Sequence, residues 1–180
     1  MQRANPFGFT LIEVLVSLLV ISIGALGMLT LQGQALRYTR EASLRGNAVM
    51  LADDLLEMMR SNREALLDAS ASSDLAGYVK AAGGVFPEVG GVSCARRDRS
   101  GGGPAVAAAD LYCWRQKVSR LLPVTPAILT EAFEVCRSRV ADRCASDNSG
   151  AAVMIRLAWA DSLGGLCVDG ICRYALRAEL

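Results

Sequence analysis

The sequence of 180 residues contains no histidine. Histidine is the commonest general base near neutral pH and a frequent metal ligand, so catalytic triads built on histidine and histidine-containing metal sites are excluded. Carboxylate chemistry is not excluded, but the chain also lacks a glycine-rich phosphate loop and a paired nucleophile and base motif. We therefore predict that the protein is not an enzyme, with no catalytic residues, no cofactor and no metal; a membrane-anchored enzyme is the disfavoured alternative.

The chain also lacks an excess of charge of either sign, because 19 basic and 18 acidic side chains leave a net charge of +1. Such a balance does not attract nucleic acid or anionic membranes over a distance. The one basic run, residues 94–100, has no aromatic side chain on which a base would stack and includes Asp98. We expect a solvated loop here, and a nucleic-acid partner is the less favoured interpretation.

Proline is scarce, with five in the chain, and none lies between residues 9 and 67. Within residues 9–31 there is a single ionisable side chain, Glu13. A helix rises about 1.5 Å per residue, so this segment is long enough to cross a hydrocarbon core of roughly 30 Å. We predict a transmembrane helix over residues 9–31, and an amphipathic continuation over residues 32–68, where apolar residues recur at threes and fours and should lie on a globular head.

The residues before this helix form a short polar leader, residues 1–8, which has one arginine and ends in Gly8. A secretory signal peptide has the opposite order, with the cleavage site after its apolar region. A cut at Gly8 would leave the apolar helix on the mature protein.

Gly8 is followed by Phe9, Thr, Leu, Ile, Glu13 and Val, and this order resembles the class III leader of type IV prepilins. The resemblance extends to about Leu31, where two later glycines are similar to those of minor pilins. It implies that a prepilin peptidase cuts between Gly8 and Phe9 and that Phe9 is then N-methylated. Many pilins carry a proline in this helix, and its absence here is a departure from the family.

Glu13 has two explanations. A carboxylate at the centre of a membrane span costs about 2.5 to 3.5 kcal/mol on insertion scales. Close to the start of the helix, snorkelling beside the positive helix N-terminus would lower that cost. The family resemblance implies instead that Glu13 serves subunit assembly by pairing with the N-terminal amine of a neighbouring subunit, and that it matters for methylation. The partners implied are other major and minor pilins through this helix, the prepilin peptidase, the inner-membrane assembly platform and the membrane itself.

Six cysteines without any C-x-x-C spacing indicate disulfides formed in an oxidising compartment. They are Cys94, Cys113, Cys136, Cys144, Cys167 and Cys172. A cytosolic leader places the head across the membrane, so we expect the inner membrane of a Gram-negative-type bacterium with the head in the periplasm, and then the pilus at the cell surface.

The clearest strand signal lies near the C-terminus. Apolar residues alternate over residues 153–160, which predicts a strand with one buried face, and a second strand is expected over residues 171–176. Asp169 and Gly170 form the residue pair that a two-residue type I′ turn prefers. That turn would pair Val168 with Ile171 and bring Cys167 opposite Cys172, with Cα atoms about 4.5 Å apart, within reach of a disulfide.

The middle of the chain is less informative. The other four cysteines allow three pairings, and proximity in sequence favours Cys94 with Cys113 and Cys136 with Cys144. A break is expected over residues 69–77, and residues 77–109 should be a loop with one short strand near Val92. A short helix is predicted over residues 110–122, with the first residue, an aspartate, as its N-cap.

Together these patterns predict an α+β protein in which the outer half of a long N-terminal helix packs on an antiparallel sheet, with a disulfide-containing head over residues 69–180. This resembles the pilin fold. The function implied is that of a minor type IV pilin, a structural subunit in pilus assembly and hence in twitching motility or adhesion. A minor pseudopilin of a type II secretion system is the closest alternative, and a DNA-uptake pilin is a third.

Overall fold

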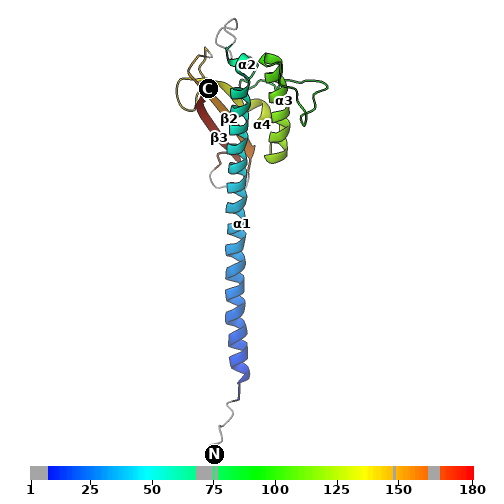
Figure 1. Cartoon of the computed structure of the whole chain (residues 1–180). Coiled ribbons are helices and arrows are strands. Elements are labelled where there is room, and N and C mark those ends of the chain that lie inside the picture. The colour runs from blue at the N-terminus through cyan, green and yellow to red at the C-terminus, as the bar shows by residue number, and fades with distance from the viewer. Residues whose placement is uncertain (1–7, 68–74, 76, 148, 162–166) are drawn as a thin grey trace, which may run out of the picture. The chain divides into compact units, whose positions relative to one another are not determined.

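The computed structural model describes residues 8–67, 75, 77–147, 149–161 and 167–180. The chain divides into two units, Met1–Arg40 and Glu41–Leu180. Four helices and three strands are described, and Figure 1 colours the chain from its N-terminus in blue to its C-terminus in red. They are α1 (Leu11–Ser61), α2 (Arg63–Leu67), α3 (Gly103–Leu121), α4 (Pro126–Glu131), β1 (Glu134–Ser138), β2 (Ala152–Ala160) and β3 (Ile171–Glu179). The predicted α+β architecture, a long N-terminal helix with a C-terminal antiparallel sheet, is confirmed.

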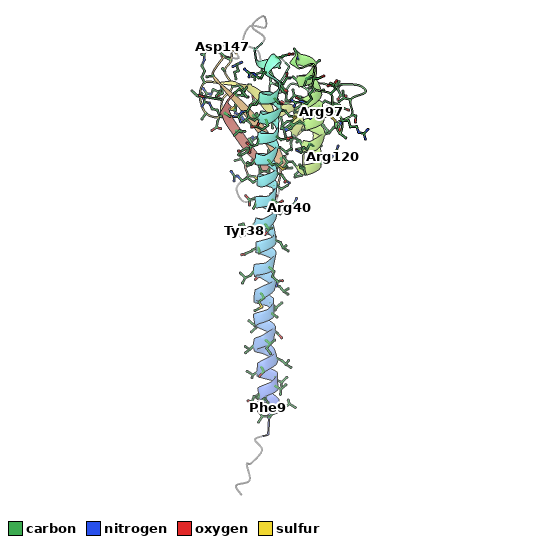
Figure 2. The ribbon with its side chains drawn as sticks, in the orientation of Figure 1. Phe9, Tyr38, Arg40, Arg97, Arg120 and Asp147 are labelled. Atoms are coloured by element: carbon green, nitrogen blue, oxygen red, sulfur yellow. A yellow bond between two sulfur atoms is a disulfide. The ribbon has the colours of Figure 1, made fainter. Side chains whose placement is uncertain are left out.

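The N-terminal unit consists mainly of the first part of α1. Its most apolar window of 18 residues has a mean hydropathy of 2.5, and none of that window is buried within the protein. Two exposed side chains of the N-terminal unit, Phe9 and Tyr38, are labelled in Figure 2. Hydroxyl groups in this segment are satisfied internally: Ser17 Oγ donates to the Glu13 carbonyl at 2.7 Å, and Ser22 Oγ donates to the Leu18 carbonyl at 2.7 Å. Such bonds suit a helix in an apolar medium, where no water replaces them.

The second part of α1 belongs to the head and supplies much of its hydrophobic core. Its buried residues follow the helical spacing of three and four. They are Ala48, Leu51, Ala52, Leu55, Leu56, Met58 and Met59. They form one cluster with buried residues of α3, α4 and the sheet, so this part of α1 packs into the head along one face.

The continuation of the helix expected over residues 32–68 is interrupted at one residue, because α1 ends at Ser61 and α2 begins at Arg63. The residue between them, Asn62, is 3 % exposed, and its side chain forms hydrogen bonds with the backbone of Gly103. Its amide nitrogen donates to the Gly103 carbonyl at 3.0 Å, and its carbonyl oxygen accepts from the Gly103 N–H at 2.8 Å. Asparagine competes well with helix when its side chain finds such backbone partners. The expected break at residues 69–77 lies largely outside the described residues.

The third helix begins earlier than expected. α3 starts at Gly103 with Pro104 in its first turn, a position where proline loses no intrahelical hydrogen bond. The predicted N-cap, Asp110, therefore lies in the middle of the helix and is fully buried. Around Val92 the structure has turns rather than the expected strand.

The sheet is antiparallel with the order β1-β2-β3. The sequence did not indicate β1, although the two C-terminal strands were expected, β3 being longer than predicted. The central strand β2 is buried on both faces rather than one, since Met154 and Ala158 are both 0 % exposed. Met154 lies opposite Cys136 of β1, so the Cys136–Cys144 disulfide lies on the same face of the sheet as the Met154 side chain.

The turn before β3 has the expected geometry. Val168 and Ile171 form a β-bridge, and the Ile171 N–H donates to the Val168 carbonyl at 2.9 Å. Asp169 and Gly170 have φ angles of 52° and 70°, as a type I′ turn requires at both central positions.

Candidate functional site

The N-terminal residues singled out by the sequence lie at the exposed start of α1. Phe9 is 79 % exposed, and Gly8 and Glu13 are also exposed. Glu13 lies in the first turn of the helix, where its N–H donates to the Thr10 carbonyl at 3.1 Å. Among the described residues its carboxylate has no hydrogen-bond or ion-pair partner. A negative charge there complements the positive end of the helix dipole and leaves the carboxylate free to accept a further donor.

The six cysteines form three disulfides, and the pairs coincide with those favoured from the sequence. Cys94 is joined to Cys113, Cys136 to Cys144 and Cys167 to Cys172, with Cα atoms 5.4, 5.7 and 4.5 Å apart. The sulfur atoms of the last pair lie near Asp161, within 4.8 Å. Because these two sulfurs are bonded to each other, they do not act as thiolate ligands for a metal.

A buried ion cluster in the head was not foreseen. Asp110 is 0 % exposed, and its two carboxylate oxygens lie 3.0 Å from Arg97 Nη1 and 2.9 Å from Arg99 Nη2. The Tyr78 hydroxyl donates to the same carboxylate at 2.6 Å. Burial, and then this hydrogen bond to the Asp110 carboxylate, raise the pKa of Tyr78 well above its usual value.

Residues 95, 96, 98 and 100 are exposed, as expected for a solvated loop, but Arg97 and Arg99 turn inward to this cluster. Arg99 reaches beyond Asp110 and donates to the Met58 carbonyl at 2.8 Å and to Ser61 Oγ at 2.7 Å, so it also satisfies the end of α1. The Cys94–Cys113 disulfide fastens the same loop to α3, one helical turn after Asp110. The cysteine followed by three closely spaced arginines was the available signal, but the sequence did not show that two of them pair with a buried aspartate.

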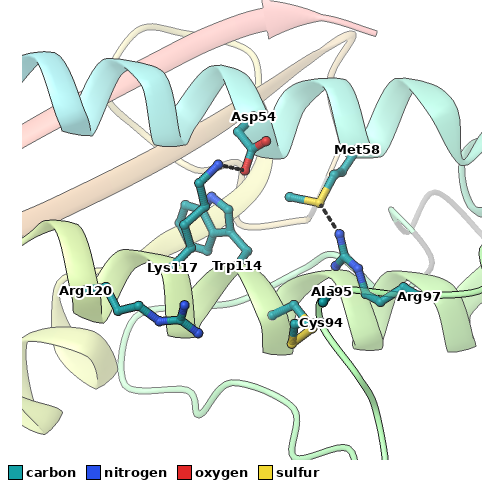
Figure 3. A pocket seen from close by; sticks show the side chains of 9 residues that line it. Asp54, Met58, Cys94, Ala95, Arg97, Trp114, Lys117 and Arg120 are labelled. Carbon is teal, nitrogen blue, oxygen red and sulfur yellow. Dashed lines mark hydrogen bonds and ion pairs between the residues drawn. A yellow bond between two sulfur atoms is a disulfide. The ribbon is translucent and has the colours of Figure 1, made fainter.

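Next to this cluster is a hollow with a volume of about 470 Å³, lined by residues of α1, α3 and the loop 94–97. Figure 3 shows Lys117 of α3 reaching across to Asp54 of α1, with Nζ 3.1 Å from the carboxylate. Arg97 Nη2 points at the Met58 sulfur, 3.5 Å away, and Arg120 lies at the other end of the hollow. The site is therefore basic, with an apolar wall.

Comparison with known families agrees with these features. The family model of the prokaryotic N-terminal methylation motif matches residues 3–29, and that of the type IV pilin Tt1218 matches residues 30–79. No curated protein and no solved structure is significantly similar to the chain. The matches meet end to end along α1 and its following segment, and the first covers much of the exposed apolar part of that helix. On these grounds the N-terminal part of the chain, residues 3–79, is similar to type IV pilins.

Proposed function

We propose that the protein is a minor type IV pilin, similar to the minor pilin PilV, that enters a pilus through its N-terminal helix. The observation that carries the proposal is the single carboxylate of Glu13 in the first turn of an exposed, apolar helix. An unpaired carboxylate in such a helix is costly, so it normally has a partner or a function. The methylation motif that matches residues 3–29 supports a function in assembly.

In this proposal the prepilin peptidase cuts after Gly8, and Phe9 becomes the methylated first residue of the mature chain. The head folds on the periplasmic side of the inner membrane and later lies on the pilus. Mass spectrometry of the membrane-extracted protein should show the loss of residues 1–8 and a methylated Phe9. A mature chain that starts beyond about residue 25 would show an ordinary signal peptide instead.

Replacement of Glu13 with alanine tests the role in assembly. If Glu13 receives the N-terminal amine of an adjacent subunit, the variant leaves that amine unpaired among helices, which typically costs about 3 to 5 kcal/mol. We expect the variant to insert and be cut after Gly8 but to be strongly depleted from sheared pili. Glu57→Ala is the matched control, because Glu57 is an exposed glutamate in the head part of α1. Equal recovery of Glu13→Ala and wild type in pili would favour snorkelling and would remove Glu13 from the assembly mechanism.

The same fractionation separates the alternatives. A minor pseudopilin of a type II secretion system would be absent from sheared pili, and its deletion would stop protein secretion while pili still form. The DNA-uptake alternative loses support from the ion cluster, since Arg97 and Arg99 contact Asp110 and have side chains only 19 % and 30 % exposed. The backbone of DNA presents a long row of phosphates and needs a row of solvent-exposed cations, which these two half-buried arginines do not provide.

A further inference from the structure

The hollow between α1 and α3 concentrates positive charge in a chain whose net charge is only +1. Three cationic side chains line it, Arg97, Lys117 and Arg120, and only one carboxylate does, that of Asp54. Like charges gathered at one concave place repel one another and are stabilised by an anion that enters it. The hollow thus has the electrostatics of an anion-binding site.

Two of the cationic side chains, Arg97 and Arg120, keep N–H donors that have no strong acceptor among the described residues. The Arg97 guanidinium contacts Asp110 through Nη1 at 3.0 Å, whereas its Nη2 donates to the Met58 sulfur at 3.5 Å. A thioether is a weak acceptor, so an oxyanion would be a better partner for this nitrogen. Arg120 is exposed and has no carboxylate partner among the residues that the structure describes, so its planar fork is available for bidentate binding.

The remaining wall of the hollow is apolar. Trp114 lies behind this wall and offers little open surface, since the residue is 1 % exposed, and its polar nitrogen is already used, because Nε1 donates to the Leu51 carbonyl at 2.8 Å. Met58 and the Cys94–Cys113 disulfide complete this wall. A volume of about 470 Å³ falls in the range of ligand pockets and exceeds what one carboxylate fills. The ligand that fits therefore joins an anionic group to an apolar body.

The hollow is also preformed. Its loop wall is fastened to α3 by the Cys94–Cys113 disulfide, and its two sides are joined by the ion pair of Lys117 with Asp54. A site that is ordered before binding loses less entropy when it is filled.

We propose that this hollow binds an acidic side chain, flanked by an apolar residue, of a neighbouring polypeptide. The inference rests on the proposed function, since assembly into a filament brings the heads of other subunits alongside. The hollow then makes the head selective for subunits that present such a residue, and the N-terminal helix provides the common anchor.

The test uses the full-length protein in detergent micelles and two probes, N-acetyl-Phe-Glu-amide and its neutral counterpart N-acetyl-Phe-Gln-amide. We expect saturable binding of the glutamate dipeptide, measured by calorimetry or by chemical-shift changes, and at least about tenfold weaker binding of the glutamine dipeptide, as loss of charge-assisted hydrogen bonds predicts. Equal binding of both probes, or no binding of either, would overturn the proposal. Inorganic phosphate is the third probe, and if it binds as tightly as the glutamate dipeptide the site is one for free anions and the polypeptide assignment fails.

Arg120→Gln should weaken binding of the glutamate dipeptide about tenfold or more, whereas Arg120→Lys should have a smaller effect because it keeps the charge. Arg115→Gln is the matched control, because Arg115 is on the same helix but is paired with Glu88 at 3.4 Å, away from the hollow. Equal losses in Arg120→Gln and Arg115→Gln would show a general charge effect and defeat the proposal. Near-UV circular dichroism of each variant checks that the head is folded.

The outcomes separate this inference from the proposed function. Absence of the wild-type protein from sheared pili defeats the proposed function, whatever the dipeptide does. Wild-type protein present in pili, without dipeptide binding, defeats only the inference.

Discussion

Replacing Asp110 with asparagine removes one charge from the interior of the head without changing the size of the side chain. The carboxylate is 0 % exposed and contacts both guanidinium groups, at 3.0 Å and 2.9 Å. The Tyr78 hydroxyl, at 2.6 Å, still finds an oxygen acceptor in asparagine. The main loss is therefore the counter-ion of Arg97 and Arg99, and the prediction isolates the electrostatic part of the cluster.

The expected cost follows from burial. Breaking one side of a fully buried ion pair costs about 3 to 5 kcal/mol. The two arginines keep side-chain exposures of 19 % and 30 %, so water takes over part of their solvation. We expect Asp110→Asn to lower the free energy of unfolding by about 2 to 3 kcal/mol. At about 2 to 4 °C per kcal/mol for a domain of this size, the unfolding midpoint should fall by about 5 to 10 °C.

The assay is thermal unfolding of the full-length protein in mild detergent, followed by near-UV circular dichroism. Glu57→Gln is the control, because it breaks an exposed pair with Arg60 in which the side chains are 67 % and 45 % exposed. Such pairs contribute about 0.2 to 1 kcal/mol. If Asp110→Asn unfolds within about 1 °C of Glu57→Gln, the reasoning about the buried cluster is wrong.

Two further predictions concern the same region. Burial and the carboxylate partner raise the pKa of Tyr78 in the folded protein, so as the pH rises the unfolded chain loses the Tyr78 proton at a lower pH than the folded chain does. The contribution of this group to stability is therefore fully present below about pH 10 and is lost as the pH rises further. Tyrosinate absorbs at 295 nm, and Tyr78 should stay protonated while the head is folded. Absorbance at 295 nm should therefore rise equally in the wild type and in Tyr78→Phe up to about pH 11. A larger rise in the wild type, by the amount of one tyrosinate, would contradict the prediction. Replacing Cys94 and Cys113 together with serine opens a loop with a sequence separation of 19 and should lower stability by about 3 kcal/mol, more than the double replacement of Cys167 and Cys172, whose separation is 5. Chemical unfolding of the two double variants measures the difference, and an equal or reversed order would refute it.

The sequence predicted those parts of the fold whose conformation depends on residues close together in the chain. The long apolar stretch of α1 and the turn at Asp169 and Gly170 depend on residues close in sequence, so periodicity and turn preference were enough. The strand β1 is different. Its five residues include charged and small side chains, and their extended conformation depends on pairing with β2 and on the bridge between Lys80 and Val135. Such long-range pairing leaves little trace in a short segment.

The error at α3 has a related cause. Glycines and a proline before Ala105 predict a loop, and an aspartate before an apolar run predicts an N-cap. Both predictions use only residues that are neighbours in sequence. In the structure Asp110 is stable in mid-helix because two arginines and a tyrosine reach it from other segments. The candidate site of the head was hidden for the same reason, while the motif at Gly8 and Glu13 was visible because it is contiguous.

The placement of α1 within the head has a consequence for the order in which the protein matures. The stripe from Ala48 to Met59 emerges early in synthesis, but it shares its core with residues of β2 and β3, which are made last. Until those strands arrive, the stripe has no sheet to cover it, and non-local pairing of this kind is slow to form and prone to aggregation. In the proposed function, the nascent head is then most vulnerable just after the N-terminal helix has entered the membrane. Holding the chain at a surface by its N-terminus keeps copies apart during that interval, so the anchor would protect folding before it serves assembly.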